Sequence, residues 1–403
     1  MAKKILVRTV IIPATYHPPH DVAARLAAWL VRETSLYPER VRDRFWIPLS
    51  DKAGRRLFGG NWHKAITSAV ETGLAERHHS YSTGRAENGR KKNRPYCKAI
   101  RLCKKHLAAS AKPFTLSKAV KKETNYNLSE VGTWLAQWLP DFVLPSDIEP
   151  TSLWSACHVE AIRAKLFYAT QCPQGRFHSN FTTMSKANRA RLTHKEHKLT
   201  RLDIQCSQPT LLDAMLIQQR KCRSTQASPN LICHTDSDFY EALLPIARQC
   251  DNYWDVKRKA SARSSSANQS PETNWKRQRP SKWKRDDVKV NLLKALFAKN
   301  AVMMRQPAFV ALEKLYPAHA AYITETKRDD YRVLAQRLQR LESTIIIDGV
   351  CGYLMEHYPD LPVLSIHDEL IAPRKIAGVV HKQIEKQFKK YGVSAKITTE
   401  NLQ

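Results

Sequence analysis

The stretch LPVLSIHDELIAP, residues 361–373, is the most informative part of this sequence. Two apolar runs flank His367, Asp368 and Glu369, and this pattern predicts a β-hairpin with two carboxylates at its tip. Taken alone the pattern is ordinary, because acidic residues are common in turns. Its meaning depends on two other segments of the chain, each of which places polar residues on a predicted strand or helix.

The first of these segments is KLTRLDIQCSQPTLLDAML (198–216), which predicts a strand followed directly by a helix. The strand LTRLDI reaches Asp203, and the helix should begin near Pro209, because proline fits the first turn of a helix. A lone aspartate at a strand end is usually a cap or a turn residue. The order nevertheless places one carboxylate just before a helix.

The second segment, KRDDVKVNLLKALFAKN (284–300), predicts a helix. Its Arg285, Lys289, Leu293 and Phe297 recur every four residues, so they share one helix face. Cations on a helix face are usually solvated and have no further role. Here they form a row with an aliphatic side chain and an aromatic ring.

Together the three segments fit the chemistry of phosphoryl transfer. Carboxylates from different strands can hold two Mg²⁺ ions about 4 Å apart. Fixed cations near a triphosphate stabilise the charge of the transition state. Asp203 and Asp368 are the candidate carboxylates, and Arg285 and Lys289 are the candidate cations.

The segments resemble motifs A, B and C of the family A DNA polymerases and of the related single-subunit phage-type RNA polymerases. The resemblance extends over about residues 170–403. It implies two Mg²⁺ ions, with Mn²⁺ as an alternative. The metal ligands it implies are Asp203, the carbonyl of Ile204, and Asp368.

The same resemblance implies roles for the residues around the metal site. Arg285 and Lys289 would bind the triphosphate of the incoming nucleotide. Phe297 would stack on the nascent base pair, and His367 would lie near the primer end. These roles are carried over by motif position and do not follow from the helix period.

Three departures from the family pattern bear on the nucleotide. The DNA polymerases carry a glutamate that blocks the ribose 2′-OH five residues after the motif A aspartate, where this chain has Gln208. Phe297 stands at the tyrosine position of motif B and lacks the hydroxyl that helps RNA polymerases favour ribonucleotides. Both changes favour deoxynucleotides. Leu293 replaces the more usual aromatic residue or methionine.

Two further segments are expected to touch nucleic acid. GRFHSNFTTMSKANRARL (175–192) is similar to the family segment that contacts the template–primer duplex, and its expected contacts are Arg176 and Arg189.

Residues 257–285 carry ten basic residues and one acidic residue, and they predict a flexible insertion. The insertion could be a solvated linker, or it could grip phosphates while Trp275 and Trp283 stack on bases.

The N-terminal part of the chain predicts a separate basic domain. Helices are expected within 21–41 and 61–73, followed by two short strands that flank a long basic loop. This order is that of a winged helix, in which a helix can enter a DNA groove while the hairpin contacts phosphates. A small basic α+β domain that only packs on its neighbour is the alternative.

Composition limits the classes of partner and compartment. A net charge of +29 makes nucleic acid the first candidate partner, with an acidic membrane surface second. No apolar run is long enough for a transmembrane helix and no export signal is recognised, so we expect a cytoplasmic protein in a bacterial, phage or plasmid context. The nine cysteines are odd in number and form no C-x-x-C pair, which favours reduced thiols.

We therefore expect an α/β (α+β) right-hand polymerase: a palm with an antiparallel sheet, helical fingers and a small winged-helix-like domain. The expected domains are 1–110 (winged-helix-like), 111–170 (helical connector or reduced thumb) and 171–403 (palm and fingers). The expected function is a DNA polymerase that adds dNTPs to the primer of a DNA primer–template. Two alternatives stay open: an RNA-synthesising primase or small RNA polymerase, and a non-catalytic DNA-binding replication or regulatory factor.

Overall fold

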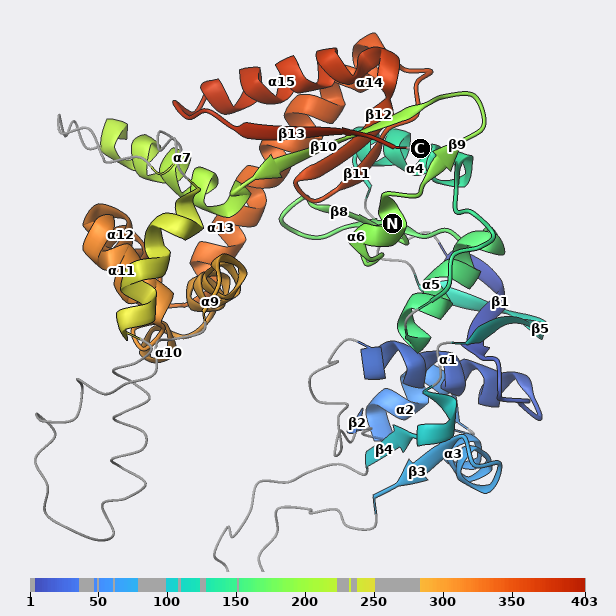
Figure 1. Cartoon of the computed structure of the whole chain (residues 1–403). Helices are drawn as coiled ribbons and strands as arrows, with labels where there is room; N and C mark the ends of the chain where they lie inside the picture. Colours follow the sequence, from blue (N-terminus) through green and yellow to red (C-terminus); the bar gives the residue numbers. More distant parts are fainter. Residues whose placement is uncertain are drawn as a thin grey trace, which may run out of the picture. The chain divides into compact units, whose positions relative to one another are not determined.

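The computed structural model of the chain combines many helices with small sheets (Figure 1). It describes residues 4–35, 47–48, 51–60, 62–78, 99–107, 110–123, 128–150, 152–222, 232, 238–250 and 283–402. Trp275 and most of the predicted insertion 257–285 lie outside the described residues. The chain divides into two compact units. The first comprises Met1–Thr170, His178–Leu199 and Leu402–Gln403, and the second comprises Gln171–Phe177 and Thr200–Asn401.

The first unit contains a two-stranded antiparallel ribbon of β1 (Lys4–Pro13) and β5 (Ala111–Glu123). Residues 111–123, expected to begin a helical connector, are therefore a strand. The physical reason is visible at Leu116, which is buried between the exposed Thr115 and Ser117. This alternation is the period of a strand with one covered face.

Three helices and a three-stranded sheet share a core in the same unit. The helices are α1 (Asp21–Ser35), α2 (Asp51–Phe58) and α3 (Trp62–Glu71), and the strands, in sheet order, are β2 (Ile47–Pro48), β4 (Ala99–Leu102) and β3 (Ala75–Arg77). Helices α1 and α3 confirm the two predicted helices. The predicted hairpin is confirmed by the antiparallel pairing of β3 and β4. Its loop, 79–98, lies outside the described residues, and the winged-helix assignment stays a prediction.

The remaining elements of the first unit are short. They are η2 (Lys104–His106), α4 (Glu130–Gln137), η3 (Leu139–Asp141), β6 (Phe142–Val143), α5 (Leu153–Arg163), α6 (Lys186–Arg189) and β9 (Thr193–His194). The helix expected over 150–170 ends earlier, at Arg163, and the strand β7 (Ala169–Gln171), which pairs with β8 (Phe177–Ser179), follows. Lys165 ends the helix with a φ of 53°, and the Leu166 amide donates to the Ala161 carbonyl at 2.8 Å. This is the usual left-handed ending of a helix, here without its usual glycine.

The second unit is organised around a four-stranded sheet. Its strands, in sheet order, are β11 (Leu364–Ile366), β12 (Glu369–Pro373), β10 (Leu199–Gln205) and β13 (Lys396–Asn401). The pairs β11–β12 and β10–β13 are antiparallel. Strands β11 and β12 are buried along their whole length, as expected for the apolar runs that flank the acidic turn.

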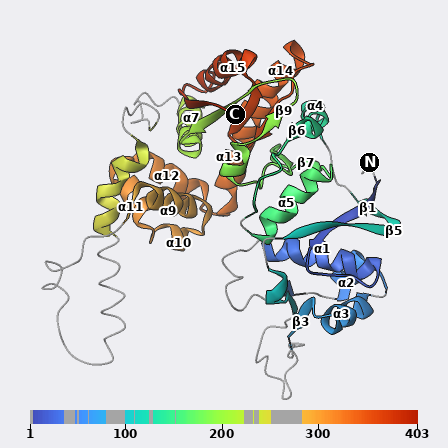
Figure 2. The same ribbon diagram turned by 45° about the vertical axis from the view of Figure 1, so that its right-hand side comes forward.

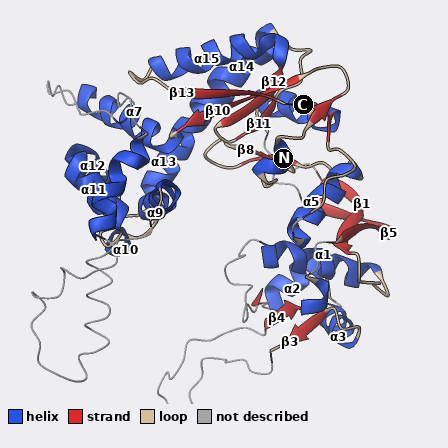
Figure 3. Ribbon diagram, viewed as in Figure 1, coloured by secondary structure: helices blue, strands red, loops and turns tan. Residues whose placement is uncertain are grey.

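Helices cover this sheet and extend away from it (Figures 1 and 3). They are α7 (Ser207–Cys222), 239–250, α9 (Arg285–Phe297), α10 (Asn300–Met303), α11 (Pro307–Leu315), α12 (Pro317–Thr326), α13 (Arg332–Ser343), the π-helical η7 (Thr344–Cys351), α14 (Gly352–His357), η8 (Arg374–Ile376) and α15 (Ala377–Lys389). Helices α9 to α12 form one cluster in both views (Figures 1 and 2). A buried contact of 2.6 Å between His319 Nε2 and Asp213 Oδ1 joins α12 to α7.

The helical element predicted over 331–358 is confirmed as the continuous series α13, η7 and α14. Its middle is π-helical. The side chain of Gln387, on α15, donates to the Gly349 carbonyl there at 3.1 Å. A Cβ at Gly349 would lie 2.6 Å from the same glutamine, so glycine permits the close approach of α15.

Among the described residues, no helix has both the length and the apolar character needed to cross a membrane.

The packing in the first unit predicts the effect of adding one methyl group. A Cβ on Gly54 would lie 2.3 Å from the ring of Trp62, which is buried. We expect Gly54→Ala to lower the free energy of unfolding by about 1–3 kcal/mol, because overpacking outweighs the better helix propensity of alanine. Gly60→Ala is the matched control, since no atom lies within 4 Å of its Cβ. Urea denaturation with equal stability for the two variants would contradict this packing.

Candidate functional site

The candidate site begins at the turn between β11 and β12. Ile366 pairs with Glu369, so His367 and Asp368 form a two-residue turn, which confirms the predicted hairpin. The turn carries one carboxylate rather than the two expected, because Glu369 is the first residue of β12 and is buried. His367 has a φ of 57°, as tight two-residue hairpin turns require at a central position. The turn therefore holds Asp368 in a narrow range of positions at the edge of a fully buried hairpin.

Strand β10 brings Asp203 to this turn. The backbone amide of Ile204 donates to the carbonyl of Asp368 at 3.2 Å, and β10 lies next to β12 in the sheet. The two aspartates of the predicted motifs A and C thus sit on neighbouring segments of one sheet. Asp203 itself is half-buried.

The electrostatics of Asp368 show how closely the acidic groups gather. Burial is the largest cause that raises the pKa of Asp368, to about 7, although some of the residue remains exposed. The negative charges of Glu342 and Asp203 raise it further, and the positive charge of Lys289 lowers it. A site in which carboxylates destabilise one another in this way is stabilised by a cation.

Helix α9 confirms the helix face predicted for motif B. Its first turn is fixed by the Asp287 carboxylate, which accepts from the Lys284 amide at 2.7 Å. Along the face, Lys289 is exposed, Leu293 is half-buried and Phe297 is 38% exposed. The ring of Phe297 is therefore partly accessible to a planar partner.

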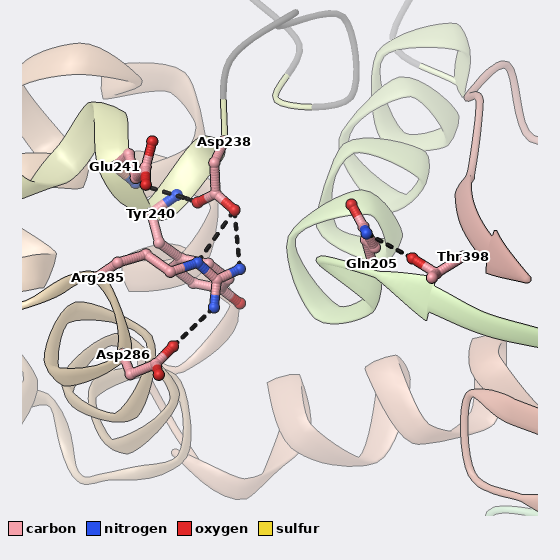
Figure 4. A network of polar contacts seen from close by, with 7 residues as sticks. All are labelled: Gln205, Asp238, Tyr240, Glu241, Arg285, Asp286 and Thr398. Carbon is pink, nitrogen blue, oxygen red and sulfur yellow. Dashed lines mark hydrogen bonds and ion pairs between the residues drawn. The ribbon is translucent and has the colours of Figure 1, made fainter. Parts of the chain in front are cut away.

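Arg285 is held by an aspartate that the sequence did not point to. Its guanidinium donates to Asp238 Oδ2 through Nε at 3.1 Å and Nη2 at 2.8 Å, and through Nη1 to Asp286 at 2.9 Å (Figure 4). The hydrogen bond to Asp238 raises the pKa of Arg285. The same guanidinium lies 5.0 Å from the ring centre of Tyr240, an additional cation–π contact.

Asp238 is in turn fixed by the helix that it precedes, 239–250. Its Oδ1 accepts from the amides of Tyr240 at 2.9 Å and Glu241 at 3.1 Å, so it caps that helix (Figure 4). Burial opposes ionisation, yet the hydrogen bonds from Arg285 and these amides leave the pKa of Asp238 below its ordinary value. An aspartate directly before FYEALL is a recognisable cap signal, but nothing in it predicts Arg285 as a partner.

Electrostatic contacts join the three motif segments into one site. Cys206, between β10 and α7, interacts with the charges of Asp238, Arg285 and Lys289. Burial raises the pKa of the buried Tyr240, and among the charges acting on it is that of Asp368. The three segments that the sequence predicts as motifs A, B and C therefore meet within the second unit. Cys206 also has a φ of 51°, so the chain turns sharply between Asp203 and α7.

Gln208, in the first turn of α7, contacts a buried carboxylate rather than open solvent. Its Nε2 donates to Glu342 Oε2 at 2.8 Å, and Nη2 of Arg176 donates to the same oxygen at 2.6 Å. Glu342, on α13, is 3% exposed, and burial raises its pKa although Arg176 and Gln208 oppose that rise. Glu342 stands in an ordinary amphipathic helix, and no pattern around it predicts a role at the site.

A buried lysine fixes the end of α9. Lys327 Nζ donates to the Ala295 carbonyl at 2.9 Å, within the last turn before Phe297, and lies 3.3 Å from Met303 Sδ. Burial lowers the pKa of Lys327 to about 8. The charge lies where a helix C-terminus favours a cation.

Three of the residues predicted to contact nucleic acid are not tested at this site. Arg189 belongs to the first unit, where its Nη1 donates to the Met184 carbonyl at 2.6 Å. Trp283 is half-buried, and its backbone carbonyl accepts from Arg248 at 2.7 Å. Trp275 lies outside the described residues. Nucleic-acid contact by these three residues stays a prediction.

The metal ligands implied by the sequence stay a prediction as well. Within the described part of the chain, no group of three or more His, Cys, Asp or Glu side chains is arranged to hold a metal ion. The predicted ligand set is instead two carboxylates, Asp203 and Asp368, with the carbonyl of Ile204. Oxygen ligands of this kind suit Mg²⁺, which usually keeps several waters and few protein ligands.

Comparison with known proteins does not assign this chain to a family. No protein-family model matches the sequence, and no curated protein matches it. One solved structure, the polymerase domain of Pol1 from M. smegmatis in complex with DNA primer-template and dNTP, matches 60% of this chain. The match covers 50% of that structure's chain, with 12% sequence identity and a TM-score of 0.33. A likeness this low carries no argument about function.

The raised pKa of Asp368 predicts a pH-dependent stability. Asp368 keeps its proton in the folded chain up to about pH 7, whereas an unfolded aspartate loses its proton near pH 4. The contribution of Asp368 to the free energy of unfolding is therefore lost as pH rises between these two values. Relative to Asp368→Asn, the wild type should lose about 2 kcal/mol between pH 4 and pH 8, a figure discounted for partial exposure.

Urea denaturation in EDTA at both pH values measures this difference. The exposed Asp360→Asn is the matched control and should not change the pH dependence. If Asp368→Asn follows the wild type at every pH, the carboxyl is not in the desolvated environment described here.

Proposed function

We propose that this chain is a template-directed nucleotidyltransferase that adds dNTPs to the 3′-OH of a DNA primer. The observation that carries the proposal is the acidic pair of Asp203 and Asp368 on neighbouring segments of one sheet, within electrostatic reach of Lys289. Carboxylates beside fixed cations are what phosphoryl transfer requires. In this proposal the four-stranded sheet is the palm, and the helices α9 to α12 are the fingers.

The acidic pair supports a divalent metal in the proposed reaction. Asp203 raises the pKa of Asp368, and a bound cation would relieve that repulsion. Asp203, Asp368 and the Ile204 carbonyl would hold Mg²⁺, or Mn²⁺ in its place. When bound there, the metal supplies Lewis-acid stabilisation of the attacking and leaving oxygens.

The chain's own side chains would bind and orient the nucleotide. Arg285 and Lys289 share one face of α9 and would pair with the triphosphate, an arrangement suited to charge stabilisation. The exposed ring of Phe297 would stack on the new base pair, and His367 would lie beside the primer end. Gln208 would occupy the space near C2′ of the sugar and favour deoxynucleotides.

The hydrogen bonds to Asp238 hold the guanidinium of Arg285 in one orientation. The guanidinium is fixed through Nε and Nη2, while its Nη1 contacts Asp286, whose side chain is 84% exposed and readily displaced. An exposed ion pair of that kind contributes about 1 kcal/mol or less. A phosphate oxygen could therefore replace Asp286 without disturbing the pair with Asp238.

Primer extension tests the proposed function directly. Purified full-length protein, Mg²⁺ and a labelled primer–template are offered dNTPs and rNTPs separately. We expect extension with dNTPs that falls by about 10³-fold or more in Asp203→Asn and Asp368→Asn, because each removes a metal ligand. Asp360→Asn is the matched control and should extend as the wild type does.

The outcomes of this assay separate the remaining alternatives. Extension with rNTPs alone would make the chain a primase or small RNA polymerase. Salt-sensitive DNA binding without any Mg²⁺-dependent synthesis would make it a binding factor, a role consistent with its net charge of +29. Undiminished extension in both aspartate variants would overturn the site assignment.

The cation row on α9 gives a separate prediction. Lys289→Ala should lower kcat/KM for the nucleotide by about 100-fold, because a fixed charge near the transferring phosphate is lost. Lys294→Ala is the matched control, since Lys294 is also exposed on α9 but lies off the row. Steady-state kinetics in which both variants behave alike would remove Lys289 from the triphosphate site.

A further inference from the structure

Glu342 is a buried carboxylate that belongs to none of the three motifs. It is 3% exposed, and its Oε2 accepts from Arg176 at 2.6 Å and from Gln208 at 2.8 Å. The donors come from segments 166 and 134 residues away in the sequence. All three residues lie in the second unit. Glu342 therefore joins the first turn of α7 to the segment that precedes motif A.

The second carboxylate oxygen of Glu342 has no partner, and Glu342 lines a small cavity. Glu342 Oε1 is buried and has no hydrogen-bond partner, and the same holds for Arg176 Nε and Ser365 Oγ. All three residues line one cavity of about 10 Å³. Ser365 lies on β11, three residues before Asp368. A volume of this size holds one water molecule when polar groups surround it.

One water would satisfy all three atoms at once. It can accept from Arg176 Nε–H and donate to Glu342 Oε1 and to Ser365 Oγ, which uses both of its protons and one lone pair. Buried polar atoms without partners are rare in folded proteins, and bridging waters are the common way in which they are satisfied. Apolar side chains also line this cavity (Phe177, Ile346 and Ile347), and the three polar atoms without partners are what favours a water there.

The carboxylate also fixes the direction of the Gln208 amide. A carboxylate only accepts hydrogen bonds, so the NH₂ group of Gln208 must face Glu342, and its carbonyl oxygen must point elsewhere. Without Glu342, rotation of the terminal amide would exchange a donor for an acceptor at the same position. Gln208 Oε1, on the other side of the amide, is buried and has no hydrogen-bond partner, so the direction of the whole amide depends on a residue of α13.

We propose that Glu342 is a positioning residue that fixes Gln208 and, through it, the sugar preference of the nucleotide site. One buried water links its second oxygen to Arg176 and to Ser365 on the strand that leads to Asp368. The role in sugar preference rests on the proposed polymerase function. The water link depends on the geometry alone.

The first experiment measures single-nucleotide incorporation of a dNTP and of the matching rNTP by the full chain. The variants are Glu342→Gln, Gln208→Leu and the double variant. We expect Glu342→Gln to change the ratio of the two kcat/KM values by about tenfold, the effect of one charged hydrogen bond. The double variant should change the ratio no more than the larger single change, because both act on one side chain.

Glu356→Gln is the matched control for this experiment, because Glu356 is a glutamate of the next helix, α14, and its side chain is 76% exposed. It should leave the ratio unchanged. A ratio that is unaffected by Glu342→Gln but altered by Gln208→Leu would overturn the positioning role. Fully additive effects of the two changes would overturn it as well. Should Glu342→Gln fail to fold, Glu342→Asp keeps the charge and shortens the side chain, and it should change the ratio in the same way.

Binding without chemistry separates this proposal from the proposed function. Fluorescent dATP and ATP are titrated against the wild type and Glu342→Gln, and anisotropy reports each Kd. Binding whose sugar preference shifts about tenfold in Glu342→Gln supports the positioning role even where no extension occurs. Extension whose sugar preference ignores Glu342 overturns the positioning role and leaves the polymerase intact. A chain that neither binds nor incorporates either nucleotide overturns both.

A crystal structure of the full chain tests the water. An ordered water within hydrogen-bond distance of Glu342, Arg176 and Ser365 is the expected result, and Ser365→Ala should retain it with one contact fewer. An empty cavity, or a Glu342 side chain turned away from Gln208, would overturn the link.

Discussion

The candidate site depends on one backbone hydrogen bond, from the Ile204 amide to the Asp368 carbonyl. It joins strand β10 to the turn between β11 and β12, so that two carboxylates are near each other before any ligand arrives. Burial of Asp368, together with the negative charges of Glu342 and Asp203, raises the pKa of that group to about 7. In the proposed function a cation would bind between these carboxylates, and a preformed site would spare the reorganisation that binding otherwise needs.

Positively and negatively charged side chains surround Asp368 and pair with one another. Lys289 lowers the pKa of Asp368 from one side, and Glu342 raises it from another. Glu342 is itself neutralised by Arg176, and Arg285 by Asp238. The first of these ion pairs joins α13 to the segment around Arg176, and the second joins α9 to the residue before helix 239–250. The pair of Arg176 and Glu342 is the more buried of the two, so salt screens the attraction between its charges less.

Much of this arrangement could be predicted where a pattern is local. The hairpin was predictable because two apolar runs flank a short acidic segment, but only the pairing of Ile366 with Glu369 limits the turn to two residues. The face of α9 was predictable from a spacing of four. The end of α5 was not, because the left-handed residue that ends it is Lys165 rather than glycine. Strand β5 was missed because its partner, β1, lies about a hundred residues earlier in the chain.

The residues that escaped prediction at the site share a physical cause. Glu342 and Asp238 receive their roles from donors that are far away in sequence, and their own surroundings are ordinary helix and cap patterns. A buried carboxylate reveals itself only when its donors are known, and those follow from the packing of α13 against α7. No periodicity within either helix contains that information.

The π-helical segment η7 has a consequence for how this chain can change over evolution. In a continuous helix each residue advances the side chains by about 100°. Loss or gain of one residue between α13 and α14 would leave the helix intact but rotate one part against the other. Glu342 would then face a different neighbour although no residue of the site had been substituted. The direction in which Glu342 points therefore depends on the number of residues in η7. An insertion or deletion there would alter the site as a substitution would.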